Sequence, residues 1–184
     1  LDIAKDASVA GLFSLLDGVI DDNGNSILLL GNALMDGTHL SSGSGNGITF
    51  GGSSTQQLYR SEAGTGTFGT VTIDNGAGVV IPDGNGYNFT IQSDLRMANG
   101  VLNIGSSLLT IGQLSEIVAV SPFSVTNMIQ TNSSFTDNGV LKNFTAGYNQ
   151  DFVFPVGELL YTPVSFNFGT GSNTFGSSNG SIKV

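Results

Sequence analysis

The chain has 184 residues, which is long enough for one domain with a substantial buried core. Five basic residues against 14 acidic ones give a net charge of −9, so its electrostatic field repels a phosphate backbone and argues against nucleic acid as a partner. There is no cysteine, which excludes disulfides, thiolate nucleophiles and cysteine-ligated metal sites.

The first predicted elements lie between Val9 and Ile20, where apolar residues taken alone fall at helical spacing. However, FSLLDGVI (residues 13–20) matches LRMANGVL (95–102), and LLLG (28–31) matches LTIG (109–112). The later copy alternates as strands do and is flanked by glycine. We therefore predict strands rather than a helix over 9–20, and an internal repeat of 13–31 with 95–112. We interpret the two copies as the same pair of strands used twice.

Residues 67–112 contain the clearest strand pattern. Turns rich in glycine and asparagine, such as DNGAG and DGNGYN, separate short segments in which apolar and polar residues alternate. Both turn residue types accept positive φ at little cost. Apolar residues at i and i+2 point to one side of a strand. They recur as Val71/Ile73, Val79/Ile81, Phe89/Ile91, Leu95/Met97, Leu102/Ile104 and Leu109/Ile111.

Two all-β architectures fit this spacing: a right-handed parallel β-helix (β-solenoid) with three short strands per turn, and an antiparallel β-sandwich. We predict the solenoid as a single elongated domain over residues 1–184, a fragment of a longer chain, with the sandwich as the alternative. The solenoid stacks residues about 20 to 25 apart, in three pairs: Ile73 with Met97, Ile81 with Ile104 and Ile91 with Ile111.

The C-terminal part is rich in aromatic residues, among which the chain has 12 phenylalanines and no tryptophan. Phenylalanine is more often buried than sugar-binding, so we predict a packed centre for this block. Its members are Phe144, Tyr148, Phe152, Phe154, Tyr161, Phe166 and Phe168. A carbohydrate-stacking patch of Tyr148 and Tyr161 is the alternative.

The single histidine, His39, is the first candidate for catalysis, because Asp36 and Ser41 are close to it in sequence. A Ser-His-Asp constellation needs these residue types in hydrogen-bond contact. No serine has a nucleophile-elbow pattern around it, which favours His39 as a residue beside a turn.

Acidic residues give two further hypotheses. Asp74, Asp83 and Asp94 recur at intervals of 9 and 11, and carboxylates on one side of a coil could hydrolyse a polysaccharide. The favoured interpretation is that each caps the backbone of its own turn. Calcium could bind the oxygen-rich turns from Asp21 to Asn25 and from Asp83 to Gly86, although neither has EF-hand or nonapeptide spacing. We predict no catalytic residue, cofactor site or metal site, and leave calcium in these turns open.

Three segments resemble a known family: GTFGTVTIDNGAGVVI (66–81), DLRMANGVLNIGSSLLTIG (94–112) and FVFPVGELLYTPVSF (152–166). They are similar to the repetitive surface proteins of Bacteroidetes that the type IX secretion system exports, and the resemblance runs from about Leu12 to Phe168. It implies an extracellular stalk with roles in adhesion, gliding or presentation of attached modules. Such proteins commonly end in a sorting domain, of which no pattern is evident before Val184.

The resemblance carries over no catalytic residue, so we expect a non-enzymatic structural or adhesive segment. The partners it implies are the secretion translocon during export, and other surface proteins or polysaccharide afterwards. No apolar run reaches the roughly 20 residues that span a bilayer, so we predict no membrane-spanning segment. The alternative function is a carbohydrate-binding or carbohydrate-active β-helix.

Overall fold

The computed structural model describes residues 1–41, 47–62, 64–132, 134, 136–147, 151–168 and 179–184. This part of the chain is all β and contains no helix, so it has no helix that could cross a membrane. The apolar stretch near the N-terminus forms three short strands, as the repeat predicts: β1 (Ala7–Val9), β2 (Phe13–Leu15) and β3 (Val19–Asp21).

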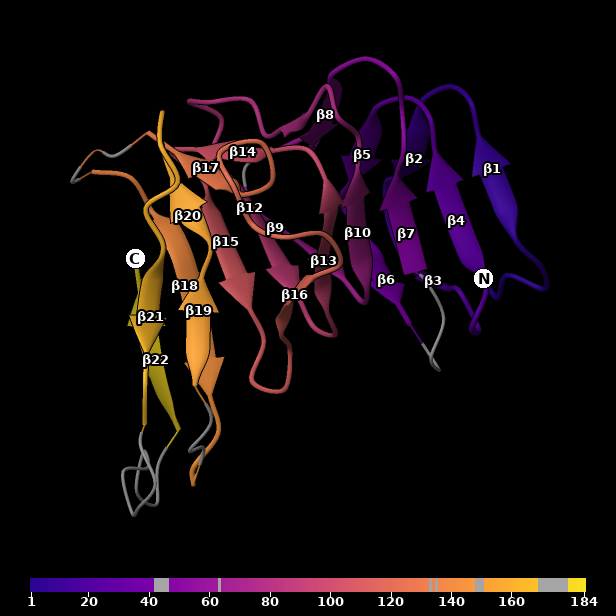
Figure 1. Cartoon of the computed structure of the whole chain (residues 1–184). Coiled ribbons are helices and arrows are strands. Elements are labelled where there is room, and N and C mark those ends of the chain that lie inside the picture. The colour runs from indigo at the N-terminus through magenta and orange to yellow at the C-terminus, as the bar shows by residue number, and fades with distance from the viewer. Residues whose placement is uncertain (42–46, 63, 133, 135, 148–150, 169–178) are drawn as a thin grey trace.

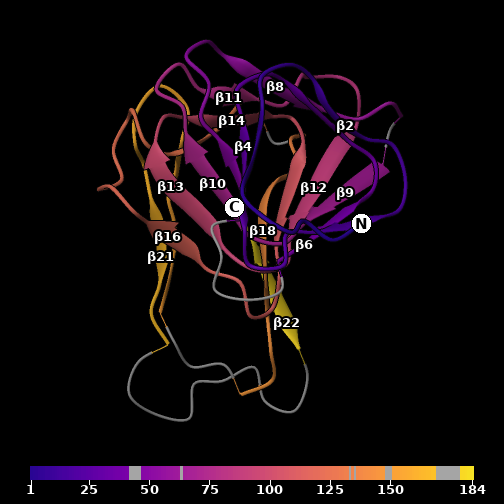
Figure 2. The same cartoon turned by 90° about the vertical axis from the view of Figure 1, so that its right-hand side faces the viewer.

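The strands wind into a right-handed parallel β-helix of about six turns, and the predicted architecture is confirmed. Each turn contributes one strand to each of three parallel sheets, called faces 1, 2 and 3 in chain order. Figure 1 shows the strands side by side along the coil, and Figure 2 shows the three sheets enclosing the core. The corners between them are called 1–2, 2–3 and 3–1.

The strands are distributed over the faces as follows. Face 1 contains β1, β4 (Ser26–Leu29), β7 (Gly47–Phe50), β10 (Val71–Asp74), β13 (Leu95–Asn99) and β16 (Ile117–Ala119). Face 2 contains β2, β5 (Ala33–Met35), β8 (Gln56–Tyr59), β11 (Val79–Val80), β14 (Leu102–Gly105), β17 (Ile129–Thr131) and β20 (Val156–Gly157). Face 3 contains β3, β6 (Thr38–Leu40), β9 (Gly64–Phe68), β12 (Tyr87–Ile91), β15 (Leu108–Ile111) and β18 (Gly139–Phe144).

The core consists of columns, meaning residues at the same register position on successive turns. Ile73 pairs with Met97 on face 1, and Ile91 pairs with Ile111 on face 3. On face 2 the Ile81 N–H donates to the Asn103 carbonyl, which brings Ile81 beside Ile104. All three predicted pairs are confirmed, and each of these residues is at most 3% exposed.

The two copies of the sequence repeat do not occupy equivalent positions. Residues 13–15 form β2 on face 2, whereas their matches at 95–97 lie in β13 on face 1. Residues 28–29 lie in β4 on face 1, whereas 109–110 lie in β15 on face 3. The copies are therefore one face out of phase, which corrects the interpretation that they are the same pair of strands. All three faces need the same alternation and the same glycine turns, so this pattern does not specify a face.

Additional strands cover the C-terminal end of the coil, at the left of Figure 1. β22 (Gly180–Lys183) pairs antiparallel with β18, and β19 (Phe152–Phe154) pairs antiparallel with β21 (Val164–Phe166). The phenylalanines predicted as a packed centre lie in contact here, with Phe144 against Phe152 and Phe168, and Phe154 against Phe152 and Phe166. Tyr148 lies outside the described residues.

Candidate functional site

The structure brings a serine, a histidine and an aspartate together at corner 3–1, but with a different aspartate from the one expected. His39 Nε2 lies 3.1 Å from Asp22 Oδ2, and Ser41 Oγ donates to the same carboxylate oxygen at 2.6 Å. Asp36 lies at corner 2–3, where it accepts a hydrogen bond from the Ser61 N–H. His39 belongs to β6 and is fully buried, so its interpretation as a residue beside a turn is wrong.

The hydrogen bonds of this cluster do not prepare a nucleophile. His39 Nδ1 accepts a hydrogen bond from the Gly69 N–H at 3.3 Å. Nε2 therefore carries the proton and donates a hydrogen bond to Asp22. The Ser41 hydroxyl donates to the carboxylate rather than to the imidazole, and accepts from the Thr70 N–H. Because His39 and Asp22 have no exposed surface, a substrate cannot reach them. The cluster instead connects the corners of three successive turns.

Burial lowers the pKa of His39 below its ordinary value, and the attraction of Asp22 only partly opposes this effect. The unfolded chain therefore binds this proton more readily than the folded chain does. The stability that neutral His39 contributes is present above a pH of about 6.5 and is lost as the pH falls through the folded pKa.

We predict that His39→Gln reduces the acid sensitivity of the fold. The free energy of unfolding, measured by urea denaturation at about pH 7.5 and about pH 5.5, should fall less with pH in the variant than in the wild type. His39 is the only histidine, so no other imidazole contributes to the difference. An identical pH dependence in both proteins would contradict a lowered pKa.

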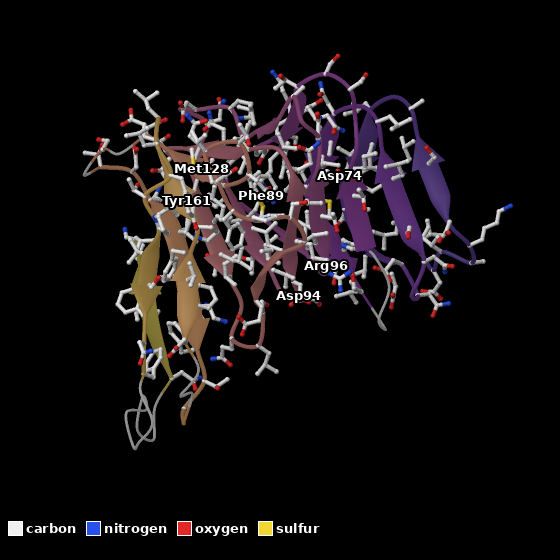
Figure 3. All side chains as sticks on the ribbon, in the orientation of Figure 1. Asp74, Phe89, Asp94, Arg96, Met128 and Tyr161 are labelled. Atoms are coloured by element: carbon white, nitrogen blue, oxygen red, sulfur yellow. The ribbon has the colours of Figure 1, made fainter. Side chains whose placement is uncertain are left out.

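Asp74, Asp83 and Asp94 lie at three different corners of one turn. Asp74 ends β10 at corner 1–2, Asp83 follows β11 at corner 2–3, and Asp94 precedes β13 at corner 3–1. Figure 3 shows Asp74 and Asp94 well separated on the coil. The hydrolase hypothesis requires the three carboxylates to line one side of the coil. They lie at different corners, so this requirement is not met.

Asp83 and Asp94 bond to the following turn rather than capping their own. Asp83 Oδ1 accepts from the Ser106 N–H at 2.7 Å, and Asp94 Oδ1 accepts from the Glu116 N–H at 3.3 Å. Asp74 is exposed and accepts no hydrogen bond from the described residues. The prediction that each aspartate caps its own turn is thus wrong for all three.

Bonds to the next turn form a general pattern, in which an Asp or Asn side chain accepts a backbone N–H from a residue 20 to 25 positions later. These bonds hold neighbouring turns in register at the corners, where the strand hydrogen bonds end. The acceptors are Asp6, Asn32, Asp36, Asp83, Asn88 and Asp94.

We predict that Asp83→Ala lowers the free energy of unfolding by about 1 kcal/mol, because its bonds to Ser106 and Asn132 lie at an exposed corner where water replaces part of them. The Ser106 N–H lowers the pKa of Asp83, so this contribution is lost as the pH falls below about 3.8. Asp74→Ala is the matched control at another corner of the same turn, and should change stability by less than about 0.5 kcal/mol. Equal effects in urea denaturation would contradict a structural role for Asp83.

In the two turns considered for calcium, the carboxylates accept hydrogen bonds from other residues of the chain. Asp21 Oδ1 accepts from the Asn23 N–H, and Asp22 bonds to Gly24, His39 and Ser41. Asp83 bonds to Ser106 and to the Asn132 amide. Nowhere in the described part do three histidine, aspartate or glutamate side chains converge as metal ligands.

Sequence reasoning missed the most buried cation, Lys142 of β18, which is fully buried. Its Nζ donates to the carbonyls of Gly112, Gln113 and Ser115 at 2.6, 3.1 and 2.7 Å, again at corner 3–1. The strand alternation could have identified it, because Lys142 lies between the inward residues Val140 and Phe144.

Corner 1–2 carries buried amides that were also missed. Gln56 Nε2 donates to the Leu29 and Gly31 carbonyls, and Asn75 Nδ2 donates to Gln56 Oε1 at 2.9 Å. This chain of bonds gives the Gly31 carbonyl a donor, and gives a second donor to the Leu29 carbonyl, which also accepts from the Gly51 N–H.

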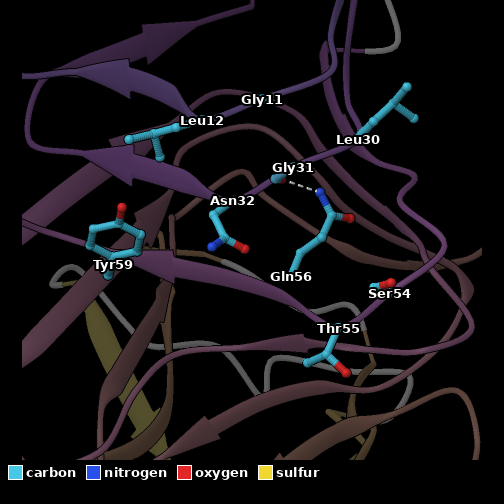
Figure 4. A pocket seen from close by; sticks show the side chains of 9 residues that line it. All are labelled: Gly11, Leu12, Leu30, Gly31, Asn32, Ser54, Thr55, Gln56 and Tyr59. Atoms are coloured by element: carbon cyan, nitrogen blue, oxygen red, sulfur yellow. Dashed lines mark hydrogen bonds between the residues drawn. The ribbon is translucent and has the colours of Figure 1, made fainter.

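Two of the open grooves on the outside of the described coil bear on the site hypotheses. One, of about 440 Å³, lies at corner 1–2 of the first three turns, reaches face 2 at Tyr59, and also includes Leu12 and Asn32 (Figure 4). The other, of about 380 Å³, lies on face 1 and includes Thr72, Asp74 and Arg96. Tyr161, the described member of the tyrosine patch considered above, lines neither groove, and burial raises its pKa.

Comparisons of the chain with protein-family models, with curated proteins and with solved structures find no match.

Proposed function

We propose that the chain is a non-enzymatic structural or adhesive segment of a secreted cell-surface protein. The observation that carries this proposal is the use of its chemically reactive side chains within the fold. Asp22, His39 and Ser41 are bonded to one another and to the next turn, and Asp83 and Asp94 hold neighbouring turns together. These contacts support a scaffold whose polar groups maintain a coil.

The arrangement of the carboxylates favours the scaffold over a carbohydrate-active β-helix. Glycoside hydrolysis commonly needs two carboxyl groups facing each other across the scissile bond. Asp74, Asp83 and Asp94 lie at different corners, and the face 1 groove includes only Asp74 among them.

The resemblance to repetitive Bacteroidetes surface proteins supports the proposed location at the cell surface and export by type IX secretion. The partners proposed with it are the translocon during export, and other surface proteins or polysaccharide on the outside. A regular coil with flat faces suits such a role, because each turn stacks on its neighbour and length can be added without a new core.

Two measurements on the purified chain test the proposal. Beads coated with it should attach to surfaces or cells that uncoated beads do not bind, and no reducing sugar should be released from polysaccharides. Turnover that disappears in a folded Asp94→Asn variant would contradict the scaffold and favour the carbohydrate enzyme. Antibody labelling of intact producing cells tests the location, and an exclusively internal signal would contradict it.

A further inference from the structure

The groove at corner 1–2 combines an aromatic side chain, two leucines and two amides without any charge. None of the nine residues that line it is ionisable at neutral pH (Figure 4). Leu12 and Leu30 are 52% and 43% exposed, and Tyr59 is partly exposed at the end of β8. Apolar and aromatic walls with a few fixed polar groups are typical of small-molecule and saccharide sites.

Asn32 presents fixed hydrogen-bond donors to this groove. Its Oδ1 accepts from the Gln57 N–H at 2.8 Å, which orients the amide, while its Nδ2 makes no hydrogen bond with the described residues. Figure 4 shows the amide nitrogen on the side where Tyr59 lies. An oriented donor beside an aromatic ring costs little ordering entropy when a ligand binds.

Asn32 begins an outward column of residues near the start of the face 2 strands, which contains three further amides and one valine. Strand register places Gln57 beside Val80, Val80 beside Asn103, and Asn103 beside Gln130. Adjacent members of this column lie about 4.8 Å apart, the spacing between neighbouring strands. Amide groups donate and accept hydrogen bonds, as sugar hydroxyls do. The column therefore offers amide contacts at four of five positions along the coil axis, with Val80 as the apolar exception.

We propose that a neutral, linear polysaccharide binds along the outside of face 2, with one sugar ring in the groove beside Tyr59 and the chain following the amide column. This inference rests on the proposed function, because it names the ligand class of an adhesive segment. A neutral glycan fits because the groove offers no charge to pair with an ionised group. The net charge of −9 also repels polyanions.

Affinity electrophoresis of the purified chain tests the proposal, with a soluble neutral β-glucan, mannan or xylan in the gel, and polygalacturonate as the charged probe. We expect at least one neutral polysaccharide to retard the chain and polygalacturonate to leave it unretarded. Tyr59→Ala should raise the Kd at least about tenfold. Asn32→Asp should do the same, because it keeps the acceptor for Gln57 and removes the donors.

Thr72→Val in the face 1 groove is the matched control, and should bind as the wild type does. Circular dichroism establishes that all variants are folded. The proposal is overturned if no neutral polysaccharide retards the folded chain, if polygalacturonate alone does, or if Tyr59→Ala and Asn32→Asp bind normally. Attachment of coated beads without glycan binding would overturn this inference and leave the proposed function standing. Binding followed by sugar release would support this inference and overturn the non-enzymatic function.

Discussion

Ile104→Asp is expected to unfold the chain or to lower its free energy of unfolding by more than about 4 kcal/mol. Ile104 has no exposed surface and lies beside Ile81 in the core of face 2. A carboxylate there would lose its hydration without gaining a partner, and it would also remove apolar contacts between turns. Typical domains are stable by only about 5 to 15 kcal/mol, so this loss is a large fraction of the total.

Asn103→Asp on the same strand is the matched control. Asn103 points outward, and its Oδ1 accepts from the Gly105 N–H at 2.9 Å, a bond that aspartate can retain. Its effect should stay within about 0.5 kcal/mol. Urea denaturation followed by circular dichroism measures both variants. Similar stability of Ile104→Asp and the wild type would contradict an inward position for Ile104.

The core pairs could be predicted from the sequence because a strand has only two sides and the turns have similar lengths. Once Ile73 and Ile91 are assigned inward, residues about 20 to 24 positions later must stack on them, as Met97 and Ile111 do. The assignment of a segment to one of three faces has no such local signal. For this reason the sequence indicates the repeat of 13–31 with 95–112 but does not indicate its offset by one face.

The polar clusters show that proximity in sequence does not identify the partners of a buried side chain in a coil. Asp36 is three residues from His39 but lies at another corner, whereas Asp22 is 17 residues away and lies in contact with it. Alternation does place Asp22 inward, two residues after the buried Ile20. The identity of its partner depends on the length of the intervening turn, which no residue pattern specifies.

Lys142→Met is expected to lower the free energy of unfolding by about 1 kcal/mol at about pH 7, because the lost hydrogen bonds are partly offset by the removal of a buried charge. Methionine fills similar space, but the carbonyls of Gly112, Gln113 and Ser115 lose their shared donor inside the fold. The Lys142 ammonium also lies 5.5 and 5.3 Å from the ring centroids of Phe144 and Phe152, contacts that a thioether does not replace electrostatically. Lys5→Met at an exposed position is the control, and should change stability by less than about 0.5 kcal/mol.

The pH dependence of the same pair of proteins tests the burial of this amine separately. Burial lowers the pKa of Lys142 from 10.5 to about 8. Between these values the unfolded chain binds the proton more readily than the folded chain, so the stability of the wild type should rise with pH across this window, by up to about 3 kcal/mol. Lys142→Met should lack this rise, because no amine remains at the corner to titrate. Parallel stability curves for the wild type and Lys142→Met between about pH 7.5 and about pH 10.5 would mean that the ammonium is solvated, contrary to its buried position against three carbonyls.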